Sequence, residues 1–282
     1  MSNVIITYPW NPGRWTNHPF PHTWKDADFA AIARDYIDLL EYMGFDKVVL
    51  SAFPDDSGNP ATIGEYQRAK LFIGTLERKG STLTACLMYE PWDEPYGDIY
   101  RRLREMRTTF EVATHPNYAR VGDRPEVYWW RCSNYEAEQN IRIAKYLDSL
   151  TGAPPWFIHA RIRNAWETRR WPIDKAAMDA GMVDRTIDRG YQYPQDRYVD
   201  FGACAGGLNH AVAYNTASVV ASTQQWLLRP DLDAFNGALA RPVPEGADRV
   251  FRDWEHNEAG TLIPAGQEWA YVQAVRKALV HA

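Results

Sequence analysis

The sequence predicts an α/β fold of parallel strands, either one closed (β/α)8 TIM-type barrel or a doubly wound sheet. Short apolar strand patterns alternate with amphipathic helical patterns through the first 160 of 282 residues. Strands that alternate with helices in this way pair in parallel through right-handed crossovers. The length suits a barrel, which takes roughly 250 residues. No linker, repeat or low-complexity tract divides residues 1–282, so we expect one domain.

The first pair of elements illustrates the pattern. Asn3–Tyr8 is short, apolar and β-branched, and a helix is expected over Asp26–Met43, where apolar residues recur at three- and four-residue spacing before Gly44. The same alternation continues along the chain. The further expected elements are the strands Asp46–Phe53, Thr82–Tyr89, Glu126–Cys132 and Pro155–Ala160, and the helices Ile63–Arg78, Tyr96–Phe110 and Glu136–Leu150.

Residues 161–245 are irregular and read as an insertion in the second half of the fold. The expected elements are a long loop over Arg161–Arg197 with one helix near Asp174–Met182, a weak strand over Tyr198–Ala203, and a strand or a helix within Ala213–Leu228. A clear pattern returns with a strand over Asp248–Trp254 and a closing amphipathic helix over Glu268–Val280. We expect both chain ends at the bottom or side of a barrel.

Composition narrows the function classes. The net charge is −5, so no basic surface for a phosphate backbone is indicated and nucleic acid is not an expected partner. No apolar run approaches the roughly 18 residues of a membrane span. The amino-terminal residues lack the features of a secretory signal, which leaves the cytoplasm as the default location and phage association or non-classical export as alternatives. The sequence does not indicate the oligomeric state.

No metal and no cofactor are expected. Cys86, Cys132 and Cys204 lack C-x-x-C spacing, which favours buried free thiols over disulfides or a zinc site. The histidines lack the short spacing of metal ligands; those considered are His115, His159, His210 and His256.

Aromatic residues are abundant, with 12 Trp, 16 Tyr and 10 Phe, or 13% of the chain. Trp and Tyr combine an apolar body with a polar group, which suits a ligand with both apolar faces and hydroxyls. Sugar rings have this character, so the excess favours carbohydrate. The alternative is that the aromatic rings fill the core.

Functional groups of parallel α/β folds follow the carboxyl ends of the strands. The candidate substrate-binding residues at these ends are Tyr8, Trp10, Tyr89, Glu90, Trp92, Trp129, Trp130, Arg131, Trp254 and His256. Glu255 and Glu258 follow the last strand directly beside Trp254. Two carboxylates beside an aromatic wall are the usual equipment for glycosidic bond cleavage, because one donates a proton and the other stays ionised. An E-x-x-E spacing alone also occurs on solvated helix faces.

Several segments resemble the endo-α-mannosidase-like barrels, a group that includes glycoside hydrolase family 99 and the WbsX-type proteins of polysaccharide gene clusters. The strongest resemblance is in Trp254–Pro264 (WEHNEAGTLIP) with Glu268–Leu279, and in His115–Trp129 (HPNYARVGDRPEVYW). Leu83–Pro91 and Tyr36–Val49 also resemble blocks of that group. The resemblance implies a closed (β/α)8 barrel and adds His115 to the substrate-binding candidates.

By this resemblance Glu255 acts as the base toward the 2-hydroxyl of the sugar and Glu258 as general acid and then base, in a retaining mechanism. Three positions depart from the family pattern, with His256, Ala259 and Ile263 where the family has an aromatic residue, Gly and Glu. These departures concern sugar specificity.

The leading hypothesis is therefore a glycoside hydrolase that acts on a polysaccharide or oligosaccharide. The alternatives are a non-catalytic barrel that recognises a polysaccharide or phage receptor, and a WbsX-type polysaccharide biosynthesis protein. Retention of both glutamates favours the hydrolase. A glycosyltransferase is disfavoured because the chain has no Gly-rich phosphate loop.

Overall fold

The fold is seen in a computed structural model of the chain. The residues that it describes are 2–7, 29–52, 65–89, 107–130, 142, 145–146, 148–150, 152, 156–162, 185–189, 198–199, 209–215, 219–220, 227–228, 232–240, 248–252 and 268–280.

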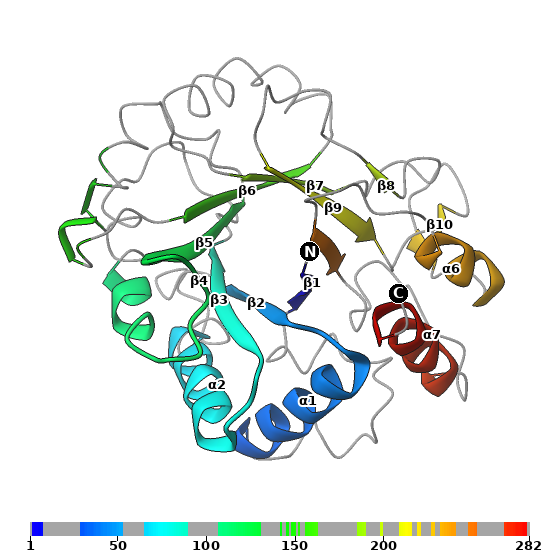
Figure 1. The fold of residues 1–282 in the computed structure, drawn as a ribbon, viewed down its shortest axis with the longest axis horizontal. Helices are drawn as coiled ribbons and strands as arrows, with labels where there is room; N and C mark the ends of the chain where they lie inside the picture. The colour runs from blue at the N-terminus through cyan, green and yellow to red at the C-terminus, as the bar shows by residue number, and fades with distance from the viewer. Residues whose placement is uncertain are drawn as a thin grey trace.

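Within these residues, eight parallel strands pair in a ring around a common axis (Figure 1). The strands are β1 (Asn3–Thr7), β2 (Lys47–Ala52), β3 (Thr84–Tyr89), β5 (Arg124–Trp130), β6 (Trp156–Ile162), β7 (Arg185–Arg189), β9 (Asn209–Asn215) and β12 (Asp248–Arg252). Each pairs with the next, and β12 pairs with both β9 and β1. The ring therefore has no free edge, and the expected barrel fold is confirmed.

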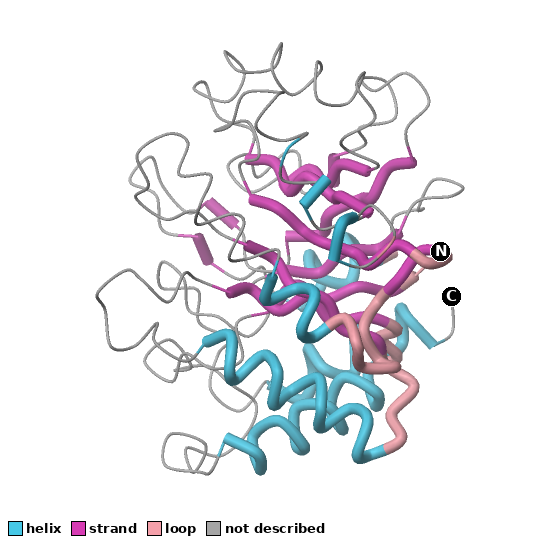
Figure 2. Tube along the Cα trace, turned by 90° about the vertical axis from the view of Figure 1, so that its left-hand side faces the viewer, coloured by secondary structure: helices cyan, strands magenta, loops and turns pink. Residues whose placement is uncertain are grey.

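The described helices lie outside this ring (Figure 1), and in the side view of Figure 2 the long helices lie below the strands. They are α1 (Phe29–Met43), α2 (Glu65–Lys79), α6 (Leu232–Leu239) and α7 (Glu268–Val280), with further helical residues at 107–112, 142, 145–146 and 148–150. Four short strands lie off the ring: β4 (Arg120–Val121) pairs with β5, β8 (Tyr198–Val199) pairs with β9, and β10 (Val219–Val220) pairs with β11 (Leu227–Leu228), each antiparallel. No described helix is long and apolar enough to cross a membrane.

The core lies on both faces of the strands. In β2 the consecutive residues Val48, Val49 and Leu50 are all buried, because one face of a barrel strand meets the helices and the other meets the interior of the ring. On the outer face, Tyr36 of α1 and Phe72 of α2 are buried with their ring centroids 6.4 Å apart. This double burial produces the continuous apolar runs that make these strands visible in the sequence.

Both ends of the described chain lie at the amino ends of the strands. The backbone amide of Ser2 donates to the Asp248 carboxylate at 2.7 Å, at the first residue of β12. At the other end, Val280 lies against Gly44, the residue that follows α1. Gly44 has a φ of 91°, which terminates α1 and favours glycine.

In the second half of the barrel the secondary structure differs from what the sequence predicts. Strand β7 lies inside the segment expected to be a long loop, β9 begins before the segment expected to hold a strand or a helix, and α6 was not expected. β7 reads Arg-Thr-Ile-Asp-Arg and lacks an apolar run, so its neighbours β6 and β9, rather than its own propensity, determine its place. The weak strand is present as β8, and the helix expected near Asp174–Met182 lies outside the described residues.

Candidate active site

The ring brings together the strand ends that precede the candidate residues. β12 ends at Arg252, two residues before Trp254, and it lies between β9 and β1. β1 ends at Thr7, immediately before Tyr8. Because all eight strands are parallel, their carboxyl ends meet at one end of the barrel, which is where TIM barrels carry their active sites.

Most of the candidates themselves lie outside the described residues: Tyr8, Trp10, Glu90, Trp92, Arg131, Trp254, Glu255, His256 and Glu258. Trp129 and Trp130 are placed by their backbone. In the strand register, Trp129 pairs with Tyr89 of β3 and with His159 of β6, and Trp130 pairs with Ala160 of β6. The register therefore places both tryptophans at the carboxyl end of β5.

Tyr89 lies in the packed layer between the barrel wall and a helical segment. Its side chain is fully buried, and its hydroxyl lies 2.6 Å from the Thr109 hydroxyl, which belongs to the segment 107–112 and is also buried. From its place at the end of a strand, Tyr89 is predicted to bind substrate. The structure instead assigns it to the core, because alternation along β3 directs this last residue outward.

His115 lies at the opposite end of the barrel from the carboxyl ends of the strands. Its Nδ1 is 2.7 Å from a carboxylate oxygen of Glu77, close to the carboxyl end of α2. Three residues further on, the backbone of Tyr118 bridges Ala85 near the beginning of β3. The expected role of His115 in substrate binding therefore does not fit its position.

The block around His115 instead joins the amino ends of two strands. Asn117 donates from Nδ2 to the carbonyl oxygens of Ser81 and Leu83, each at 2.9 Å, and the Tyr118 hydroxyl donates to the carbonyl of Glu126 at 2.8 Å. The backbone of 117–119 also bonds to Ala85 on β3. This block, which carried part of the family resemblance, thus has a structural role between β3 and β5.

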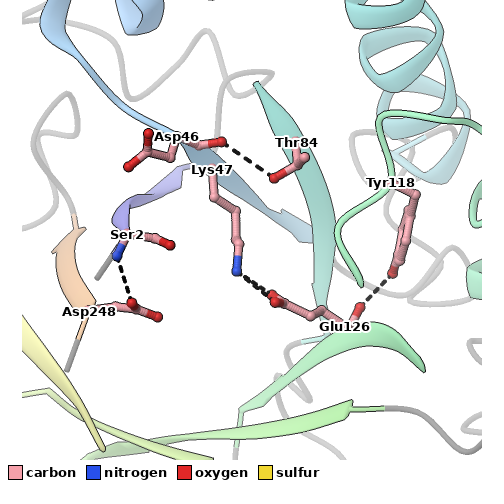
Figure 3. Close-up of polar contacts among 7 residues, drawn as sticks. All are labelled: Ser2, Asp46, Lys47, Thr84, Tyr118, Glu126 and Asp248. Carbon is pink, nitrogen blue, oxygen red and sulfur yellow. Dashed lines mark hydrogen bonds and ion pairs between the residues drawn. The ribbon is translucent and has the colours of Figure 1, made fainter. Parts of the chain in front are cut away.

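An ion pair that no sequence motif indicates lies inside the ring (Figure 3). The ammonium of Lys47, the first residue of β2, is 2.7 Å from both carboxylate oxygens of Glu126 on β5. The side chains are 12% and 4% exposed. Because β3 stands between β2 and β5, the pair passes across the inner side of β3 and connects the amino ends of β2 and β5.

The ion pair lies near one buried thiol, that of Cys86, and one buried hydroxyl, that of Tyr118. Burial raises the pKa of the Cys86 thiol well above its ordinary value, the Glu126 carboxylate raises it further, and the Lys47 ammonium opposes them. The pKa of Tyr118 is also raised, first by burial and then by Cys86 and Tyr89. Both groups are therefore protonated at neutral pH, and Cys86 is the buried free thiol that the sequence predicted. Cys132 and Cys204 lie outside the described residues.

No cluster of three or more His, Cys, Asp or Glu side chains suited to a metal ion occurs in the described part of the chain. The ion pair of Lys47 with Glu126 and the hydrogen bonds of Asn117 and Tyr118 join strands at the amino end of the barrel. The chemistry predicted from the sequence belongs to the segments that follow the strands at the other end.

Solved structures with the same fold include several glycoside hydrolases. One described as a glycoside hydrolase-like protein aligns with a TM-score of 0.67 at 13% identity over 99% of this chain and 94% of that chain. The GH99 endo-α-mannosidase from Bacteroides thetaiotaomicron aligns with a TM-score of 0.58 at 11% identity over 98% of each chain. The α-amylase from Geobacillus thermoleovorans, in complex with acarbose, gives a TM-score of 0.53 at 8% identity over 99% of this chain and 78% of that chain.

These similarities support the fold alone, a (β/α)8 barrel. They extend over several hydrolase families and do not single out family 99. No protein-family model and no curated protein sequence matches the chain.

Proposed function

We propose that the protein is a glycoside hydrolase that cleaves a polysaccharide or oligosaccharide, with Glu255 and Glu258 as its catalytic pair. The observation that supports this most is the position of β12. This strand closes the ring and ends at Arg252, so the segment with both glutamates leaves the barrel at its carboxyl end. In TIM barrels the catalytic groups gather at that end.

The proposed mechanism uses two carboxylates in different protonation states. Glu255 takes the proton of the sugar 2-hydroxyl as that oxygen bonds to the anomeric carbon, and Glu258 protonates the leaving oxygen as the glycosidic bond breaks. Glu258 then takes a proton from the water that attacks the anomeric carbon, and Glu255 returns its proton to the 2-oxygen as the anhydro ring opens. Two neighbouring carboxylates resist simultaneous ionisation, so one of them holds its proton above the ordinary pKa of a glutamate. The family resemblance supports assigning that proton to Glu258 and supports an endo-mannosidase-like reaction with retention of configuration.

The proposed substrate contacts come from the neighbouring strand ends. Glu90 and Trp92 follow β3, Trp10 follows β1, and Trp130 ends β5. Position 130 has the same parity along β5 as Glu126, whose side chain lies inside the ring, and position 129 has the opposite parity. We therefore favour Trp130 over Trp129 as a substrate contact.

The test is a hydrolysis screen with purified protein. Aryl glycosides and polysaccharides, mannans among them, are incubated with the parent protein and with the Glu255→Gln/Glu258→Gln double variant. We expect the parent to release product with retained anomeric configuration, seen by proton NMR, and the double variant to release none at an unchanged melting temperature. Cleavage by the double variant at the parent rate would contradict the assignment. Binding of a polysaccharide without any cleavage would instead support the non-catalytic alternative.

A further inference from the structure

An exposed aromatic pair lies on the outside of the barrel, between α1 and α7. Tyr42 is 39% exposed and Trp269 is 52% exposed, and their ring centroids are 6.3 Å apart with the planes at 89°. The other large hydrophobic residues exposed within the described part of the chain are Val121 and Val280. Single exposed hydrophobic residues are common on protein surfaces, whereas apolar surface that is contiguous and bordered by polar groups is typical of binding sites.

Polar side chains hold and border this pair. Gln273 donates from Nε2 to the Tyr42 hydroxyl at 2.7 Å. The Arg276 guanidinium lies 4.2 Å from the centroid of the Tyr42 ring, and its Nη1 donates to the Tyr42 carbonyl. Trp269, Gln273 and Arg276 follow one another at spacings of four and three residues, so they line one side of α7. We call Tyr42, Trp269, Gln273 and Arg276 the α1–α7 patch.

We propose that the α1–α7 patch is a carbohydrate-binding platform, separate from the proposed catalytic pair, that takes a pyranose ring of a polysaccharide. A pyranose has an apolar C–H face that can stack on the indole of Trp269, as well as hydroxyls that need partners. The Gln273 side-chain carbonyl accepts from such hydroxyls, and the remaining guanidinium N–H groups of Arg276 donate to them. The inference rests on the proposed function only in choosing polysaccharide as the source of the sugar.

The size of the patch favours a sugar over a protein partner. A stable protein interface takes about 800 Å² from each partner, with an apolar centre. Here the apolar surface among the described residues consists of the aromatic pair and Val280, which follows Arg276 by four residues and lies against Gly44, and the exposed Lys277 stands next to Arg276 in the sequence. One or two sugar rings match that area. The contacts from Gln273 and Arg276 hold Tyr42 in place before binding, which reduces the entropy lost when a ligand docks.

The test is affinity electrophoresis of the full chain in gels that contain yeast mannan, soluble starch, xylan or alginate. We expect at least one polysaccharide to retard the parent and, equally, the Glu255→Gln/Glu258→Gln variant. Trp269→Ala should weaken that retardation about tenfold in apparent affinity, and Trp269→Phe should weaken it less. Val121→Ala removes exposed apolar surface on the β4–β5 hairpin and should leave the retardation unchanged. Melting temperatures of all variants check that they are folded.

Two results would overturn the platform. One is retardation that is absent or insensitive to Trp269→Ala in folded protein. The other is a parent that self-associates in size-exclusion chromatography through a contact that Trp269→Ala abolishes, which would make the patch an interface between copies. The platform and the proposed function fail separately. Retardation that depends on Trp269 without any hydrolysis would reject the catalytic proposal alone, and hydrolysis without such retardation would reject the platform alone.

Discussion

The two ends of the barrel differ in how their polar groups are used. At the amino end, polar side chains bind partners far away in sequence, as between Asp248 and Ser2 or between Lys47 and Glu126. At the carboxyl end, β12 and β1 lead directly into segments rich in Trp, Tyr and Glu. One end of a parallel barrel can thus stabilise the fold while the other remains available for chemistry. Substitutions at the two ends should therefore change different measured quantities.

The largest effect is expected at the carboxyl end, on catalysis. General acid–base help is worth about 10²–10⁴-fold, so Glu258→Gln should reduce kcat by about that factor. Glu255→Gln should reduce it similarly, because it removes the partner step. Neither variant should shift the melting temperature, since neither removes a contact of the amino end. Steady-state kinetics on the substrate found in the screen, with thermal unfolding beside it, checks both. A large loss of stability in either variant would mean that the glutamate has a structural role.

The next largest effect is expected at the amino end, on stability. Glu126→Leu leaves the Lys47 ammonium nearly buried without its carboxylate, and breaking a buried ion pair in this way costs about 3–5 kcal/mol. The double variant Lys47→Met/Glu126→Leu removes both charges and should recover much of that loss. Urea unfolding measures all three proteins, and kcat of the folded variants should equal that of the parent. A single variant as stable as the parent would show that the pair does not hold these strands together.

A smaller effect is expected where the last helix meets the first. A Cβ at Gly44 would lie 2.8 Å from Cγ2 of Val280, and the φ of 91° is also unfavourable for alanine. Gly44→Ala should cost about 2 kcal/mol or more from conformation and overlap together. Gly80→Ala is the matched control, because its φ is 62° and nothing lies within 4 Å, so it should cost about 1 kcal/mol.

Adding Val280→Ala to Gly44→Ala should remove the overlap and return part of the lost stability. The free energies of unfolding of these variants, from urea titrations, measure how closely α7 packs on the end of α1. Equal losses for Gly44→Ala and Gly80→Ala would mean that the two helices do not meet as closely as the structure indicates.

The first half of the fold could be predicted because burial there leaves a local signal. Val48, Val49 and Leu50 are buried on both faces of β2, so they form a continuous apolar run. β7 has no such run, with Arg185, Asp188 and Arg189 among its five residues. Its place is determined by pairing with strands distant in sequence, and periodicity does not reveal that pairing.

The sequence predicts the positions of some site residues but not which side chains meet in space. The sequence indicates which residues follow each strand, but Lys47 and Glu126 are 79 residues apart and share no motif. The outward direction of Tyr89 requires a reference residue in β3, because alternation fixes relative and not absolute direction. His115 was assigned by resemblance, and the block around it carries structural hydrogen bonds of Asn117 and Tyr118.

The smallest effect is expected at the end of β3, where the buried Tyr89 is followed by Glu90 of the proposed site. Tyr89→Phe removes the hydroxyl that lies 2.6 Å from Thr109, and a buried hydrogen bond of this kind contributes about 0.5–1.5 kcal/mol. The ring remains in place, so the core keeps its volume and no cavity forms. We expect a loss of about 1 kcal/mol in the free energy of unfolding, with kcat and KM unchanged, because the ring faces the helical segment 107–112.

Glu90→Gln, one residue further along, is the matched variant, and we expect it to raise KM or lower kcat while leaving stability within about 0.5 kcal/mol of the parent. Urea unfolding and steady-state kinetics on the two variants test the boundary directly. If Tyr89→Phe impairs kinetics as much as Glu90→Gln, the wall and the site overlap at this strand, and the separation between the two ends of the barrel is less complete than we infer.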